Sequence, residues 1–157
     1  MKILVLGAPF SGLRCMFNML KLAGYDVGFE KPGKDGMVRT TLFADEFYIN
    51  GYARVYHIVS NPLLAIPALS KFLKRKEHQL FMTVDDWVKT NNRLRSLSDE
   101  TARIENIKND WPSEMFRPKK FSKFAIGIKP MPISKLQEMG DLGMAAVKLA
   151  TSYGYEL

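Results

Sequence analysis

A short strand, a glycine-rich turn and an amphipathic helix open the chain, and this succession most constrains its fold. Lys2–Leu6 is an apolar run that ends at Gly7, which is typical of a buried parallel strand. Ser11 can cap a helix that runs to about Ala23, and Gly24 follows as a natural terminator. The apolar side of this helix consists of Leu13, Met16, Phe17, Leu20 and Leu22. Strand, turn and helix together predict the first half of a βαβ unit.

Strands and helices alternate along the rest of the chain. Pro62 suits the first position of a helix, whereas Pro67 predicts a kink or a late start in that helix. Further strands are predicted at 26–30, 53–60 and 101–107, helices at 79–97 and 134–153, loops at 31–36 and 109–123, and an extended segment at 124–129. This alternation predicts an α/β fold with a mainly parallel sheet, in a single domain of residues 1–157.

The charge balance indicates an anionic partner. The net charge is +7, from 23 basic and 16 acidic residues, and phosphate-bearing small molecules satisfy it as well as nucleic acid does. The basic runs 71–76 and 117–123 are more typical of solvated faces, so we do not expect a nucleic-acid partner. The single Cys15 excludes an intrachain disulfide and fits a reducing compartment. Because there is no export signal and no run of about 20 apolar residues, we expect a cytoplasmic protein without a membrane partner.

The turn between Gly7 and Gly12 has the pattern of an anion site. Successive N–H groups at a helix start converge on one point, where the helix dipole adds roughly half a positive charge. The spacing matches the loop G-x-x-x-x-G-K-[ST] up to its second glycine, but Leu13 and Arg14 replace the Lys and the hydroxyl residue. This difference argues against a magnesium-dependent kinase or NTPase. Taken alone, the loop fits an anion site and a plain connecting turn equally well.

Two further residues are candidates for proton transfer. Glu30 would end the second strand at the carboxyl edge of the sheet, where it is either a general base or a surface carboxylate paired with Lys31 or Lys34. His57 lies inside an apolar strand, which favours a hydrogen-bonded core histidine over a catalytic one. We expect no metal site, because Asp85–Asp86 has no third ligand nearby in the sequence.

Four separated stretches, in order along the chain, resemble the sulfotransferases. The loop 7–12 is similar to their G-x-P-R-S-G-T-T loop, and "GYDVGFEKPGKDGMV" (24–38) resembles a segment that reads G-x-D-V-G-H-E and then G-x-D-G. "YHIVSNPLLAIPAL" (56–69) is similar to H-x-V-R-D-P-L-x-x-I-x-S-L. "WVKTNN" (87–92) and "ARIENI" (102–107) resemble W-x-x-x-N and R-x-E-D-L. The chain therefore resembles small bacterial or phage-type members of this family.

The resemblance implies a three-layer P-loop fold and a nucleotide-binding transferase. Such an enzyme moves a sulfuryl group from 3′-phosphoadenosine 5′-phosphosulfate to a hydroxyl or amine acceptor, and we expect no metal cofactor. The implied catalytic residues are Glu30, His57 and Arg14. The implied cofactor-binding residues are Gly7, Ala8, Pro9, Phe10, Ser11, Gly12, Leu13, Arg14 and Ser60.

Several family positions carry a different residue here. Phe10 replaces the basic residue of the loop, Phe29 replaces a histidine, and Ser60 and Ala68 stand where the family has the arginine and the serine of the 3′-phosphate site. An arginine–phosphate pair contributes ~1.5–3 kcal/mol to binding, so the loss of these residues weakens the binding of a cofactor of this kind. The alternative is thus a catalytically impaired pseudoenzyme that binds a protein or another phosphorylated ligand. The sequence indicates neither the acceptor nor the oligomeric state.

Overall fold

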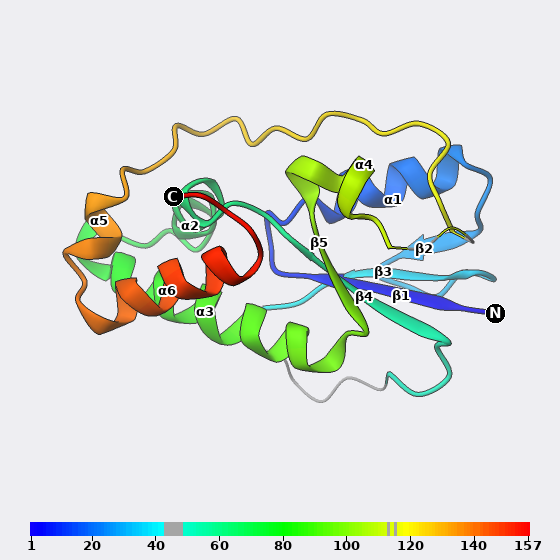
Figure 1. Cartoon of the computed structure of the whole chain (residues 1–157), viewed down its shortest axis with the longest axis horizontal. Coiled ribbons are helices and arrows are strands. Elements are labelled where there is room, and N and C mark those ends of the chain that lie inside the picture. The colour runs from blue at the N-terminus through cyan, green and yellow to red at the C-terminus, as the bar shows by residue number, and fades with distance from the viewer. Residues whose placement is uncertain (43–48, 113, 115) are drawn as a thin grey trace.

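A five-stranded sheet forms the centre of the molecule in the computed structural model, which describes residues 1–42, 49–112, 114 and 116–157 (Figure 1). The strands are β1 (Ile3–Gly7), β2 (Val27–Phe29), β3 (Gly36–Thr40), β4 (Arg54–Val59) and β5 (Glu100–Arg103). They lie in the order β2-β3-β1-β4-β5, and every pairing is parallel. All five residues of the central β1 are buried, as the apolar run predicts.

Helices cover both faces of this sheet (Figure 1). On one face, α1 (Leu13–Leu22) and α4 (Ile107–Asp110) pack on apolar side chains of β1 and β4 such as Val5 and Ile58. On the other face lie α3 (Leu80–Leu97) and α6 (Asp141–Ser152), with Leu94 of α3 against Leu4 and Leu6. The helices α2 (Pro62–Phe72) and α5 (Ser134–Gln137) lie beyond the carboxyl ends of the strands. The predicted α/β class, with a parallel sheet flanked by helices, is confirmed.

Two helix ends agree with the sequence in atomic detail. The Asn61 side chain accepts a hydrogen bond from the Leu63 N–H at 2.9 Å, and Pro62 occupies the first turn of α2. At the end of α1, Gly24 has φ 95°, its N–H donates to Lys21 O at 3.0 Å, and the next N–H donates to Leu20 O at 3.1 Å. This pair of hydrogen bonds is a Schellman motif, which glycine favours.

Pro67 lies inside α2, and the helix neither starts late nor stops at it. A proline there leaves the carbonyl of Leu63, four residues earlier, without its helical donor. The Met131 N–H donates to that carbonyl at 2.8 Å. The missing helical hydrogen bond is thus replaced by one from the segment that precedes α5.

Four sequence predictions need correction. No strand was predicted at Gly36–Thr40, yet β3 lies there between β1 and β2. The strand predicted at 101–107 ends at Arg103, and a 3₁₀ turn (Ile104–Asn106) leads into α4. The helix predicted at 134–153 is divided by Gly140, which has φ 60°. The cap of α1 is Gly12 rather than Ser11, with no side-chain hydrogen bond.

Candidate functional site

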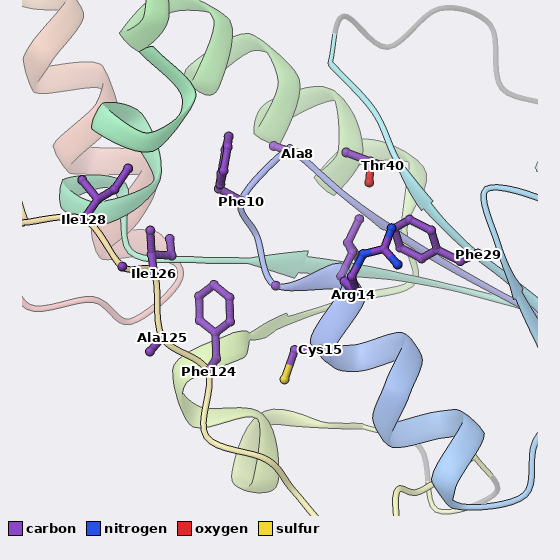
Figure 2. A pocket seen from close by; sticks show the side chains of 13 residues that line it. Ala8, Phe10, Arg14, Cys15, Phe29, Thr40, Phe124, Ala125, Ile126 and Ile128 are labelled. Atoms are coloured by element: carbon purple, nitrogen blue, oxygen red, sulfur yellow. The ribbon is translucent and has the colours of Figure 1, made fainter. Parts of the chain in front are cut away.

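A cavity of about 450 Å³ opens at the carboxyl edge of the sheet, beside the first turn of α1 (Figure 2). Three parts of the chain line it: the loop after β1 with the start of α1, the carboxyl ends of β2 and β3, and a segment far along the sequence. The lining residues are Ala8, Phe10, Gly12, Leu13, Arg14, Cys15, Phe29, Thr40, Phe124, Ala125, Ile126, Gly127 and Ile128. Parallel α/β sheets place their ligands at this edge.

The loop before α1 is held in a left-handed conformation at two positions. Phe10 has φ 65° and Gly12 has φ 85°. The Ser11 N–H donates to Ala8 O at 3.1 Å, and the Ser60 hydroxyl donates to Phe10 O at 2.9 Å. A Cβ on Gly12 would lie 2.4 Å from Cγ1 of Ile104, so the loop packs directly on the chain after β5. The first helical hydrogen bond runs from Met16 N–H to Gly12 O, and the N–H groups before it have no partner within the helix.

Ser11 points back toward the strand and not along the helix. A Cβ added to Gly7 would lie 2.2 Å from the Ser11 hydroxyl oxygen. Ser11 is 2% exposed, and its oxygen has no hydrogen-bond partner among the described residues. A buried hydroxyl without a partner is costly, and Ser11 is not among the residues that line the cavity.

Arg14 is the one charged residue among the described side chains that line the cavity. It is exposed in the first turn of α1, and its guanidinium carbon lies 4.4 Å from the ring centroid of Phe29 (Figure 2). A cation over an aromatic face is held by the ring quadrupole. Next to it, burial raises the pKa of the Cys15 thiol, so this side chain remains a protonated thiol.

Glu30 lies at the end of β2, beside two lining residues. Its φ of 57° turns the chain there, and its N–H donates to Val38 O at 2.9 Å. One carboxylate oxygen accepts the Thr40 N–H at 2.8 Å. The side chain is exposed, and Phe29 and Thr40 both line the cavity. Glu30 is therefore held at the rim with a second oxygen that can accept a proton.

His57 lies in the core of the molecule, outside the lining of the cavity. It is 0% exposed, with Nε2 3.0 Å from the amide oxygen of Asn91 and Nδ1 3.3 Å from the Thr101 hydroxyl. Burial lowers its pKa to about 4, against the effect of the Asn91 hydrogen bond. The imidazole is neutral at pH 7 and has no exposed surface to offer an acceptor, so of the two predicted bases only Glu30 reaches solvent.

The two positions that resemble the 3′-phosphate site have other contacts here. Ser60 is 1% exposed, and its hydroxyl is occupied by the carbonyl of Phe10. Ala68 is 1% exposed within α2. The Phe10 ring meets the Phe72 ring edge to face, with the centroids 5.8 Å apart. Ser60 and Phe10 thus take part in contacts that hold the loop, and Ala68 is buried in α2.

Residues 124–128 form a wall of the cavity that the sequence did not identify (Figure 2). They belong to a connection that was predicted as a surface loop and an extended segment. This connection is fixed on both sides of the wall: the Ser122 N–H contacts Sδ of Met19 at 3.2 Å, and the Met131 N–H donates to Leu63 O. The alternation of Phe124, Ile126 and Ile128 with small residues was the available signal.

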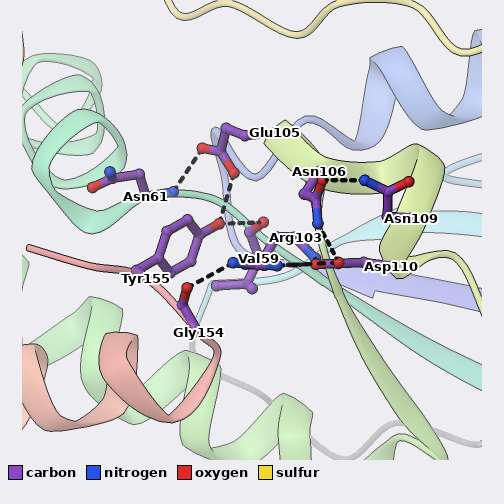
Figure 3. A network of polar contacts seen from close by, with 9 residues as sticks. All are labelled: Val59, Asn61, Arg103, Glu105, Asn106, Asn109, Asp110, Gly154 and Tyr155. Carbon is purple, nitrogen blue, oxygen red and sulfur yellow. Dashed lines mark hydrogen bonds and ion pairs between the residues drawn. The ribbon is translucent and has the colours of Figure 1, made fainter.

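A polar network joins the carboxyl ends of β4 and β5 to the C-terminal residues (Figure 3). Glu105 accepts the Asn61 N–H at 2.8 Å and the Tyr155 hydroxyl at 2.6 Å. Arg103 donates to Asp110 at 2.6 Å and to Gly154 O at 2.6 Å. Since Asn61 follows Ser60, the network ends one residue from the contact that holds the loop.

No group of three or more His, Cys, Asp or Glu side chains among the described residues could hold a metal ion. None of the helices formed by those residues is long and apolar enough to span a bilayer.

Comparisons with known proteins give little beyond the fold. No model of a known protein family matches the sequence, and no curated protein matches it. Among solved structures, the chain is similar to mouse sulfotransferase SULT7A1 complexed with PAP, at 12% identity and a TM-score of 0.47 over 97% of this chain. The chain covers 62% of the length of that neighbour. A likeness at this level assigns neither a family nor a ligand.

Proposed function

We propose that this chain is a sulfotransferase-type protein that takes 3′-phosphoadenosine 5′-phosphosulfate at the cavity beside α1. The acceptor would be a hydroxyl or an amine. The observation that carries the proposal is a cavity at the carboxyl edge of the sheet that is lined by the loop before α1 and by Arg14. The order of the four sequence stretches that resemble sulfotransferases supports it.

The residues at the loop fit one anionic group. The helix start supplies N–H donors and the positive end of the helix dipole. The Ser11 hydroxyl is buried without a hydrogen-bond partner among the described residues, and Gly12 lines the cavity with its backbone. Arg14 supplies the charge. The phosphosulfate end would therefore be held by residues 8–14.

The second phosphate needs cations from another part of the chain, because Ser60 and Ala68 supply none. A neighbouring cavity of about 520 Å³ has Phe124 in its lining in common with the first. Lys108 and Lys123 line it, together with Asn106 and Asn109. These are the cations that we assign to the 3′-phosphate.

When bound, the cofactor supplies the sulfuryl group. Glu30 would take the proton of the acceptor, because its carboxylate lies at the rim and is oriented by the Thr40 N–H. Arg14 would stabilise negative charge at the loop without moving far, since it is already placed over Phe29. The apolar wall of Phe124, Ile126 and Ile128 would exclude water from the transfer.

Calorimetric titration with 3′-phosphoadenosine 5′-phosphate tests the binding site directly. We expect measurable heat at millimolar ligand, and about tenfold weaker binding in Arg14→Gln, because one charge-assisted hydrogen bond is lost. The matched control is Arg93→Gln, which removes an exposed arginine from α3 and should leave binding unchanged. Lys108→Gln should weaken this ligand more than it weakens adenosine 5′-phosphate.

Two results would contradict the proposal. One is the absence of heat at millimolar ligand in the unaltered chain together with its appearance in Phe10→Arg, which would indicate the pseudoenzyme alternative. The other is an equal loss of binding in Arg14→Gln and Arg93→Gln, which would show that only the overall charge matters.

A further inference from the structure

Exposed apolar side chains gather at the connection between α2 and α3. Six large hydrophobic side chains are exposed among the described residues, and three of them lie within residues 72–82. Phe72 is 65% exposed, Phe81 53% and Met82 40%. We call residues 71–82 the α2–α3 segment. It lies at the end of the molecule opposite the N-terminus (Figure 1).

The charged residues of this segment leave a positive surface. Lys71, Lys74 and Lys76 are exposed, and no ion pair recorded among the described residues neutralises them. Arg75 turns inward and pairs with Asp86 at 2.5 Å. Glu77 is neutralised by Lys135 at 3.1 Å. Three exposed lysines therefore belong to the same segment as the exposed aromatic and methionine side chains.

The turn that presents these side chains is well held. Lys74 has φ 54°, and the Arg75 N–H donates to Ser70 O at 2.9 Å, which closes the end of α2. The Lys76 N–H donates to the side chain of Gln79 at 3.1 Å, which starts the next helical turn. The segment is thus a fixed turn whose apolar side chains are partly exposed, and the Phe72 ring also meets the Phe10 ring edge to face.

We propose that the α2–α3 segment binds the surface of a membrane that contains anionic lipid. Phe72, Phe81 and Met82 would enter the interface between headgroups and acyl chains, while the three lysines attract the lipid charge. A methionine and a phenylalanine next to each other at the start of α3 suit a bilayer better than a base-stacking platform. Binding of this kind needs no membrane-spanning helix.

Co-sedimentation with lipid vesicles tests this inference on the full chain. We expect binding to vesicles of phosphatidylcholine with phosphatidylserine, much weaker binding to phosphatidylcholine alone, and a further decrease at high salt. Lys71→Gln/Lys74→Gln/Lys76→Gln should lower the partition coefficient about a hundredfold, at about tenfold for each 1.4 kcal/mol. Phe81→Ser/Met82→Ser should lower it at every salt concentration, because its effect is apolar.

Matched controls separate this surface from general charge and hydrophobicity. Lys119→Gln/Lys120→Gln/Lys129→Gln removes the same charge from another exposed region, and Leu22→Ser removes a side chain that is 76% exposed. Both should bind vesicles like the unaltered chain. The inference is overturned if the control lysine variant loses as much binding as the first, or if the unaltered chain does not sediment with anionic vesicles at low salt. Retention of single-stranded RNA by the same lysines, without vesicle binding, would also overturn it.

Discussion

Residues at positions that differ from the sulfotransferase pattern make specific contacts around the loop before α1. The Ser60 hydroxyl holds the carbonyl of Phe10, the Phe10 ring packs on Phe72, and Arg14 lies over Phe29. Ser60→Arg would remove the hydroxyl that donates to the loop and would introduce a charge at a position that is 1% exposed. Phe10 faces the cavity, so a cation is better restored there.

His57 makes the stability of the protein depend on pH. Its pKa is about 4 in the folded chain and near 6.5 when unfolded, so the unfolded state binds more protons between these values. The neutral, buried His57 therefore contributes fully to the free energy of unfolding above the pKa of the unfolded chain. This contribution is lost as the pH falls toward the pKa of His57 in the folded chain. We expect the free energy of unfolding to decrease by about 2 kcal/mol from about pH 7.5 to about pH 5.

Urea titrations across this range measure the effect. His57→Gln should remove most of the slope, because glutamine does not titrate there. His78→Gln is the control, since His78 is exposed in the turn before α3 and its removal should leave the slope unchanged. A slope that persists in His57→Gln would assign the pH dependence to other groups.

At the scale of elements, the start of α1 depends on its contact with the chain after β5. Gly12 has the left-handed conformation and also faces Ile104, which is 1% exposed. A side chain at this position meets both a conformational cost and a steric one. The loop at the cavity and the turn that leads into α4 are therefore one packed unit.

Gly12→Ala should lower the free energy of unfolding by about 2–4 kcal/mol. The conformational part is about 1 kcal/mol, and the remainder arises because Cβ would lie 2.4 Å from Cγ1 of Ile104. Gly24→Ala is the matched control: it has φ 95° and no atom within 4 Å of the added Cβ, so it should lose only the conformational part. Equal losses in the two variants, measured by urea unfolding, would show that the Ile104 contact is not tight.

Across the whole molecule, the carboxyl edge of the sheet brings distant segments together. The loop after β1, the end of β2, the turn after β5 and residues 124–128 meet there, and Glu105 ties the last residues of the chain to the start of α2. Burial raises the pKa of Tyr155 far above its ordinary value, so its hydroxyl stays protonated and donates to Glu105.

Tyr155→Phe should lower the free energy of unfolding by about 1–2 kcal/mol, because a hydrogen bond to a charged group is lost. A double-mutant cycle with Glu105→Gln should reveal coupling between the two positions. The comparison cycle is the exposed pair of Asp85 and Lys89, for which we expect weaker coupling. Additive effects at Tyr155 and Glu105 would indicate that the network does not hold the C-terminal residues.

The sequence predicts a local conformation wherever residues close together in the chain decide it. The strand before Gly7, the cap at Asn61 and the glycine stop at Gly24 follow from backbone preferences and, at Asn61, from a side-chain acceptor within two residues. The α/β class follows from their alternation. The cap at Ser11 was predicted wrongly, because its hydroxyl turns toward Gly7 and the glycine next to it takes the cap position.

Tertiary packing decided the features that depend on contacts between segments far apart in the sequence. β3 exists because it is held between β1 and β2, Pro67 stays in α2 because Met131 supplies the missing donor, and the cavity has a wall because residues 124–128 cross the edge of the sheet. His57 is neutral because the fold buries it, which its neighbours in sequence alone do not determine. The sequence by itself thus determined most of the elements and the glycine turn between β1 and α1. Only the tertiary structure decided which side chains face that turn, since contacts across the fold depend on where the sheet brings each segment.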